Sequence, residues 1–202
     1  MGYLVLIRHG ESIWNRENKY TGWTDIGLSE KGIEESARAG ELLGAYSFDK
    51  GYTSRLERAR CTMQVILKSL NADDTPVLET KSLNERNFGD LEGLKKSAAL
   101  EKYGEKNMAK WLKGFEYAPP HGESLKQTSA RVLEFFKTVI AKDLNRGENV
   151  LLVAHGMVMR ILIGALENMD WENSVQIEVP NAHPRIYLFD KINGVFVAVR
   201  QA

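Results

Sequence analysis

Two short apolar runs in this chain each end in the dipeptide His-Gly. The first, "LVLIRHG", leads from Leu4–Ile7 into Arg8 and His9, and the second, "NVLLVAHG", leads into His155. Near-continuous apolar runs of this length are typical of strands buried on both faces of a parallel sheet. In such sheets ligands bind beyond the carboxyl ends of the strands. If these two strands are neighbours in the sheet, His9 and His155 face each other at a ligand site.

The rest of the chain alternates strand-like and helix-like segments. Apolar patterns predict further strands over residues 48–54, 186–189 and 195–199, and helices over 29–43, 55–70, 124–140 and 157–169. This alternation predicts an α/β fold of three layers, in which a mostly parallel central sheet is flanked by helices. No linker, low-complexity tract or repeat interrupts the pattern, so we expect a single domain over residues 1–202.

Capping and turn residues mark where several of these elements begin or end. Ser29 is a candidate helix N-cap, and Ser124 with Gln127 forms a capping-box pattern. Asn193–Gly194 predicts a hairpin turn between the last two strands. On the helix after Ser29, helical spacing predicts a common face for Ile33, Ala37, Gly40 and Leu43.

The charge balance and the cysteine count exclude several functions. Lys and Arg number 27 and Asp and Glu number 27, so no general affinity for nucleic acid or for an anionic membrane is expected. Any anion site must be built locally. Cys61 is the single cysteine, which excludes an internal disulfide and a CxxC motif. No signal-like or membrane-spanning apolar stretch is present, so the expected location is the cytoplasm.

The residues after the two apolar runs suit a phosphoryl group. Arginine offers a planar fork to phosphate oxygens, and a neutral imidazole can act as a nucleophile. The segment "TSRLERAR" supplies Arg55, Arg58 and Arg60 just after another strand, and Thr53 or Ser54 is expected to cap the helix that follows.

Structural interpretations compete with this one. A single His-Gly is more often a turn, Arg55, Arg58 and Arg60 fit the solvated face of a helix, and Glu85 with Arg86 fits a surface pair. A metal site formed by His9, His155 and a carboxylate is a weaker alternative, because the adjacent arginine disfavours a cation. No metal is therefore expected. The motifs of common nucleotide-binding loops are not found in the sequence.

Longer motifs carry a family resemblance. "LIRHGES" resembles the signature of the histidine phosphatase superfamily, and "RHGESIWNRENKYTGWTDIGLSEKG" is similar to the cofactor-dependent phosphoglycerate mutases. The similarity continues in order through "YTSRLERA", "LNERNFGDLEGL", "PPHGESL" and "VLLVAHG", and so spans nearly the whole chain. The resemblance implies the phosphoglycerate mutase-like form of the α/β fold.

The resemblance also implies a role for each matched residue. His9 matches the nucleophile that becomes phosphohistidine, and Glu85 matches the general acid and base. Arg8, Arg58 and His155 match the group that holds the phosphoryl group. The positions implied to contact the substrate are Ser12, Asn15, Thr21, Gly22, Arg86, Phe88, Lys96, Lys113, Gly156 and Met157.

Some positions depart from the pattern of the family's mutases. Met157 stands where Asn is common, Leu112 and Lys113 stand where an arginine pair is common, and Phe88 replaces Tyr. The stretch between Pro120 and Glu123 is short, and no lysine-bearing tail follows the last strand. These differences concern substrate grip and water exclusion rather than the phosphohistidine machinery, so phosphatase leakage is expected beside mutase activity.

The resemblance implies a phosphoglycerate mutase of glycolysis and gluconeogenesis. It would interconvert 3-phosphoglycerate and 2-phosphoglycerate through phosphohistidine, with 2,3-bisphosphoglycerate as the priming phosphoryl donor. The alternative enzyme is a histidine-type phosphomonoesterase of small phosphorylated metabolites, and a phosphate-binding pseudoenzyme ranks third. The expected partner is a small phosphorylated metabolite, with no nucleic acid or membrane, and the sequence leaves monomer and homo-oligomer open.

Overall fold

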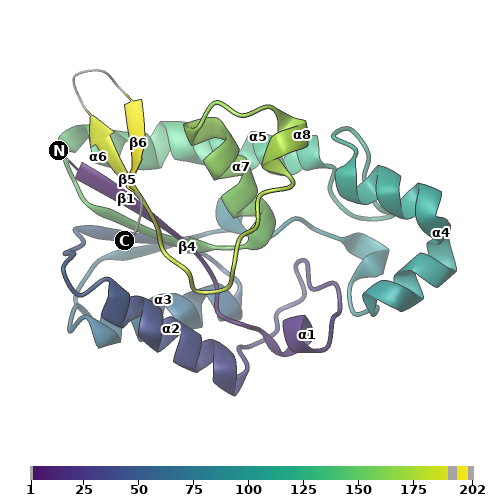
Figure 1. The fold of residues 1–202 in the computed structure, drawn as a ribbon, viewed down its shortest axis with the longest axis horizontal. Coiled ribbons are helices and arrows are strands. Elements are labelled where there is room, and N and C mark those ends of the chain that lie inside the picture. The colour runs from purple at the N-terminus through teal and green to yellow at the C-terminus, as the bar shows by residue number, and fades with distance from the viewer. Residues whose placement is uncertain (1, 191–194, 200–202) are drawn as a thin grey trace.

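The computed structural model describes residues 2–190 and 195–199 and is built on one six-stranded sheet (Figure 1). The spatial order of its strands is β3-β2-β4-β1-β5-β6. Their bounds are β1 Gly2–Arg8, β2 Lys50–Ser54, β3 Val77–Thr80, β4 Val150–Ala154, β5 Arg185–Asp190 and β6 Val195–Val199. The α/β class and the three-layer arrangement predicted from the sequence are thereby confirmed.

The two apolar runs lie side by side, so the condition for His9 and His155 to meet is fulfilled. β1 and β4 pair in parallel, with Leu6 opposite Leu152 and Arg8 opposite Ala154. β2 and β3 continue the parallel part, whereas β5 and β6 are antiparallel additions. The predicted turn at Asn193–Gly194 lies outside the described residues. Because β1 and β4 end at the same level, the residues that follow them meet at one edge of the sheet.

Helices cover both faces of the sheet (Figure 1). Alternate residues of β1 explain why both faces are apolar, since Leu4 and Leu6 pack into one core cluster and Val5 and Ile7 into the other. The second cluster includes residues of α2 and α3, and the first includes residues of α5 and α7. The helices are α1 Ile13–Arg16, α2 Glu30–Leu42, α3 Glu57–Ser69, α4 Lys96–Lys113, α5 Leu125–Phe135, α6 Ala141–Arg146, α7 Gly156–Leu166 and α8 Trp171–Ser174.

The region between β3 and α5 projects beyond the carboxyl ends of the strands. It holds the short 3-10 turns η1 Lys81–Leu83 and η2 Gly89–Leu91 and then α4, at the right of Figure 1. α4 is interrupted at Gly104, whose φ of 75° is in the left-handed region. α4 and η2 form a small separate core, which holds Leu91, Ala99 and Met108.

The caps of two helices are as predicted, but two other predictions are wrong. Ser29 caps α2, and Ser124 opens α5 with a complete capping box, after which a π-helical segment, η3 Phe136–Ile140, leads into α6. Ile33 is 46% exposed and does not share the buried face of α2. The N-cap of α3 is Leu56, without a side-chain cap bond, so neither Thr53 nor Ser54 caps this helix.

No helix among the described residues is long and apolar enough to cross a membrane.

Candidate active site

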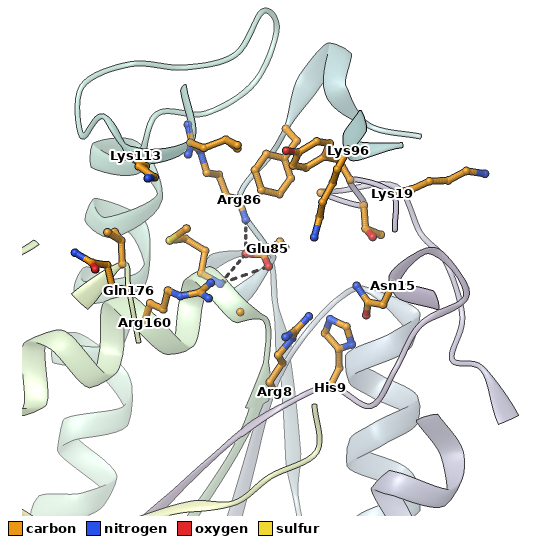
Figure 2. Close-up of a pocket in the computed structure, with 18 of the residues that line it drawn as sticks. Arg8, His9, Asn15, Lys19, Glu85, Arg86, Lys96, Lys113, Arg160 and Gln176 are labelled. Carbon is orange, nitrogen blue, oxygen red and sulfur yellow. Dashed lines mark hydrogen bonds between the residues drawn. The ribbon is translucent and has the colours of Figure 1, made fainter. Parts of the chain in front are cut away.

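A cavity of about 960 Å³ lies where β1 and β4 end (Figure 2). Its walls come from the segment after β1, from residues 85–88, from the C-terminal end of α4 and from the start of α7. The expected site residues that line it are Arg8, His9, Asn15, Thr21, Gly22, Arg58, Glu85, Arg86, Phe88, Lys96, Lys113, Gly156 and Met157.

His9 is held in place by backbone hydrogen bonds to β4 and to the side chain of a distant asparagine. Its amide donates to the carbonyl of Ala154 (2.9 Å), and its carbonyl accepts from Nδ2 of Asn181 (2.7 Å). Nδ1 of the ring lies 2.7 Å from the carbonyl oxygen of Gly10. Because a carbonyl can only accept, Nδ1 must carry the proton. The lone pair of the neutral ring is then on Nε2, which is the arrangement a nucleophilic imidazole requires.

His155 lies behind the cavity wall rather than in it. Its ring is fully buried and its centroid is 5.1 Å from that of His9. Nε2 lies 2.7 Å from Oγ of Ser54, and the same hydroxyl accepts a bond from the amide of Leu56 (3.2 Å). The Ser54 hydroxyl is therefore aimed at His155, which explains why it does not cap α3. Nδ1 of His155 is buried without a protein partner.

Two arginines surround the histidine pair. Arg58 is 1% exposed, and its guanidinium donates to the carbonyls of Thr24 (3.1 Å) and Gly22 (2.7 Å). Arg8 donates to the carbonyl of Val179 (2.9 Å). Burial lowers the pKa of Arg58 to about 10, so the side chain is still a cation at neutral pH. The solvated-face interpretation is therefore wrong for this arginine.

Burial and these cations keep the histidines neutral. Burial is the largest cause that lowers the pKa of His9 well below its usual 6.5, followed by the charges of Arg58 and Arg8. The pKa of His155 is lowered well below the same value by burial first and then by Arg58. This combination suits a phosphate dianion. The arginines supply the positive charge, and each neutral ring keeps a lone pair on one nitrogen.

Glu85 enters the cavity from the opposite side. Its Oε1 accepts from the amides of Arg86 (2.9 Å) and Met157 (3.3 Å), as the dashed lines of Figure 2 show. Its charge acts on Arg8, Arg58 and Arg86, so the carboxylate lies among cations. Glu85 is thus a carboxylate that lines the cavity beside the cationic side chains.

The outer part of the cavity is cationic as well. Arg86 is fully buried, and donates to the carbonyls of Glu123 (2.8 Å) and Tyr117 (3.1 Å). Burial lowers the pKa of its guanidinium to about 10. Its Nη1 and Oγ1 of Thr21 are buried without a protein partner. Lys19, Lys96 and Lys113, labelled in Figure 2, also line the cavity, which therefore fits a second anionic group.

Ser12 does not line the cavity, although the sequence placed it at the site. Its hydroxyl accepts from the amide of Asn15 (3.1 Å), and its own amide donates to Oδ1 of Asn15 (3.1 Å). This reciprocal cap fixes α1 and leaves Asn15 on the cavity wall.

The interpretation as the solvated face of a helix fits two other arginines. Arg55 is exposed, and Arg60 pairs with Glu79 at 3.8 Å.

Several supporting residues were missed by the sequence interpretation. Besides Ser54 and Asn181, they include Glu92, whose carboxylate accepts from the amides of Trp23, Thr24 and Phe88 at 2.9–3.0 Å. This carboxylate ties together two loops that border the cavity. Neither loop has an apolar period, so only the motif "GDLEG" was available as a signal.

No group of three or more His, Cys, Asp or Glu side chains in the described ranges is arranged to hold a metal ion.

Two neutral histidines, the buried Arg58 and the partly buried Arg8 gather where a parallel strand pair ends, and this arrangement fits a phosphoryl group. The chain matches the family model of the histidine phosphatase superfamily (branch 1) over residues 4–201, and it belongs to that superfamily.

Relatives of two kinds are similar to the chain. A Gloeobacter violaceus protein, 2,3-bisphosphoglycerate-dependent phosphoglycerate mutase 2, is 42% identical over 91% of this chain and 84% of its own length. The structure of a phosphoglycerate mutase from Bacillus anthracis superposes with a TM-score of 0.79 and 26% identity, covering 98% of this chain and 91% of that one. An alpha-ribazole phosphatase from Shigella flexneri gives 0.85 and 28%, covering 98% and 94%.

Proposed function

We propose that the chain is a phosphoglycerate mutase that interconverts 3-phosphoglycerate and 2-phosphoglycerate through a phosphohistidine. The observation that carries the proposal is the cavity with two cationic ends. One end has Arg8 and Arg58 beside His9, and the other is lined by Arg86, whose Nη1 has no protein partner. A phosphorylated carboxylic acid needs both ends, one for each anionic group.

The side chains can perform the transfer without further groups. Nε2 of His9 attacks phosphorus, the bond from phosphorus to the ester oxygen breaks, and Glu85 gives its proton to that oxygen. For transfer in the other direction, Glu85 takes the proton of the accepting hydroxyl as the phosphorus–nitrogen bond breaks. Arg8 and Arg58 neutralise the charge on the phosphoryl oxygens, which is the main requirement of phosphoryl transfer.

The cavity also fits 2,3-bisphosphoglycerate as the priming cofactor. Arg86 and Thr21 line the cavity, and each has a buried polar atom without a protein partner. Arg86, Thr21 and Lys96 would hold the second phosphate, and Arg8 and Arg58 the first. When bound, this cofactor supplies the phosphoryl group that charges His9. No metal ion enters the proposal, because the arginines supply the positive charge.

We place this activity in one domain over residues 1–202, acting in the cytoplasm on a small phosphorylated metabolite. The family match over residues 4–201 supports the single domain. A pseudoenzyme is disfavoured, because Arg8, His9, Arg58 and Glu85 all line one cavity.

A product assay tests the proposal. Purified protein receives 3-phosphoglycerate with and without a catalytic amount of 2,3-bisphosphoglycerate, and both 2-phosphoglycerate and free phosphate are measured. We expect 2-phosphoglycerate to form, and its rate to rise with the bisphosphate. Release of phosphate with no 2-phosphoglycerate under either condition would contradict the proposal.

A phosphomonoesterase is the second candidate, favoured by two apolar side chains in the cavity. Leu112 and Met157 line it where the family's mutases commonly have an arginine and an asparagine. They cannot hold an anion or donate a side-chain hydrogen bond, so the intermediate is gripped less firmly and water reaches the phosphohistidine more often. The structural similarity to the Shigella phosphatase also supports the phosphomonoesterase candidate.

We predict measurable hydrolysis of 2,3-bisphosphoglycerate beside isomerisation. The double variant Leu112→Arg and Met157→Asn should lower the ratio of phosphate release to isomerisation by about tenfold, since a charge-assisted hydrogen bond contributes about 1.5–3 kcal/mol. The variant Leu42→Arg, at an exposed position outside the cavity lining, is the control. A wild type that releases no phosphate, or an unchanged ratio in the double variant, would refute this role.

A further inference from the structure

The segment that carries Glu85 and Arg86 into the cavity is not part of the sheet. β3 ends at Thr80, and residues 81–83 form only one 3-10 turn. An irregular segment must satisfy its backbone carbonyls by other means. Those of residues 81, 82, 84 and 85 converge on one side chain of α5, Arg131.

Arg131 spreads its donors along this segment. Nη1 donates to the carbonyls of Ser82 (3.0 Å) and Asn84 (2.8 Å), with Lys81 at 3.4 Å, and Nη2 donates to the carbonyl of Glu85 (2.8 Å). The bonds to residues 84 and 85 fix the peptide planes on both sides of the Glu85 Cα atom. Because those planes set the direction in which a side chain leaves the backbone, Arg131 controls where the carboxylate points.

Glu123 fixes the guanidinium and reaches the same segment. Its two carboxylate oxygens accept from Nε (2.9 Å) and Nη2 (2.8 Å) of Arg131, a bidentate pair. Oε2 also accepts from the amide of Asn87 (2.9 Å), and the carbonyl of Glu123 accepts from Nε of Arg86 (2.8 Å). The side chains of the pair are only 19% and 17% exposed, so water competes little for these bonds.

Trp23 completes the support from a third element. Its indole Nε1 donates to the Glu85 carbonyl at 2.6 Å, the same oxygen that Arg131 contacts. The guanidinium carbon of Arg131 lies 5.8 Å from the centroid of the Trp23 ring. Three segments distant in sequence therefore meet at the carbonyl of one residue.

We propose that Arg131, held by Glu123, is a positioning residue for the general acid Glu85. The pair does not line the cavity and acts through the 84–87 backbone, which it locks so that the Glu85 carboxyl reaches the leaving oxygen. This inference rests on the proposed role of Glu85. Lysine cannot replace the arginine, because it has three donors on one atom and no planar fork.

The leaving group of the substrate gives the decisive test. An alkoxide leaving group needs a proton from Glu85, whereas p-nitrophenolate departs readily without one. The rate of His9 phosphorylation is measured in single turnovers with 2,3-bisphosphoglycerate, which has an alkoxide leaving group, and with p-nitrophenyl phosphate. The variants are Arg131→Lys, Glu123→Gln and the milder Trp23→Phe, with Glu85→Gln as reference and Arg146→Lys, an exposed arginine paired with Glu148, as control.

A positioning role predicts a selective loss. Acid–base catalysis contributes about 100-fold or more, so Glu85→Gln should slow the alkyl substrate by that factor. Arg131→Lys and Glu123→Gln should slow it by about tenfold or more, with the aryl substrate within about twofold of wild type. Trp23→Phe should give a smaller loss of the same kind, and it tests the inference even if the arginine variants fold poorly.

Two outcomes would overturn the inference. Equal losses for both substrates in the variants of Arg131, Glu123 and Trp23 would mean that these residues only stabilise the fold. No loss for either substrate would mean that they contribute nothing to this step. If Glu85→Gln is selective while those variants are not, the positioning role alone is wrong. If Glu85→Gln itself shows no selectivity, the proposed acid and the inference built on it both fail.

Discussion

The ring of His9 has one nitrogen, Nε2, that is available for chemistry, because Nδ1 is engaged with the Gly10 carbonyl. We therefore predict that brief incubation with a phosphorylated donor gives a phosphoenzyme that is labile in acid and stable in alkali. His9→Ala should abolish it, and His121→Ala, at an exposed histidine, should not. Labelling that survives in His9→Ala, or that resists acid, would assign the nucleophile elsewhere.

Ser54 is expected to matter because it orients a buried ring. Its hydroxyl accepts from the Leu56 amide and lies 2.7 Å from Nε2 of His155, so it is the protein partner of that ring nitrogen. Ser54→Ala removes this partner, and a lost buried hydrogen bond costs about 1–3 kcal/mol. We expect kcat to fall about tenfold, whereas Ser69→Ala, at an exposed residue, should match wild type. Unchanged kcat in Ser54→Ala would remove this role.

Among the helices and strands, the sequence predicted those whose apolar runs or capping residues lie next to one another in the chain. β1 and β4 are continuous apolar runs, and the caps at Ser29 and Ser124 follow from neighbouring residues alone. β3 was not predicted, because Val77 and Leu78 lie 39% and 42% exposed on an edge strand and show no buried face.

The candidate site was predictable to a similar extent. The residues attached to the strand ends and to the long motifs were found, whereas the burial of Arg58 depends on loop carbonyls that only the folded chain brings together. The contacts of Ser54 and Asn181 join residues 101 and 172 positions apart, and no local pattern encodes such distances.

The turn after β1 can approach α2 only because two glycines meet. A Cβ on Gly10 would lie 2.2 Å from the carbonyl oxygen of Gly32, and one on Gly32 would lie 2.0 Å from that of Glu11. Both distances are far too short for a non-bonded contact between a carbon and an oxygen atom. Gly10→Ala must therefore move α2 away from the end of β1, which is where His9 is held.

We predict that Gly10→Ala lowers the free energy of unfolding by about 1–3 kcal/mol, the usual range for overpacking, and lowers activity with it. Gly44→Ala is the matched control, because the nearest contact of its new Cβ would be at 3.2 Å in an exposed turn. Urea unfolding of the two variants measures the difference. Equal unfolding midpoints would show that the contact relaxes without cost.

For the whole molecule, the buried histidine pair links stability to pH. The pKa of His9 and that of His155 lie well below their unfolded value of 6.5, through burial and then the charge of Arg58. As the pH falls below 6.5, the unfolded chain takes up protons that the folded chain refuses. The stability contributed by the neutral rings is thus complete above pH 6.5 and is lost progressively below it.

We predict that the free energy of unfolding falls between pH 6.5 and 5 by up to about 1.4 kcal/mol per pH unit for each histidine. His9→Asn should remove about half of this slope. His121→Asn should leave the slope unchanged, since that ring is 84% exposed beside Asp90. Urea titrations at each pH give the slope, and a profile identical in wild type and His9→Asn would exclude the linkage.

The pairing of β1 with β4 and β5 has a consequence for translation. The ribosome makes the strand before His9 ahead of the other strands of the sheet, and its two neighbours belong to residues 150–154 and 185–190. Asn181, which binds the carbonyl of His9, is made 172 residues later. Nascent or prematurely terminated chains therefore contain the nucleophile without its pocket. The complete site for a phosphate ester therefore forms only after residues 181–190 have been made.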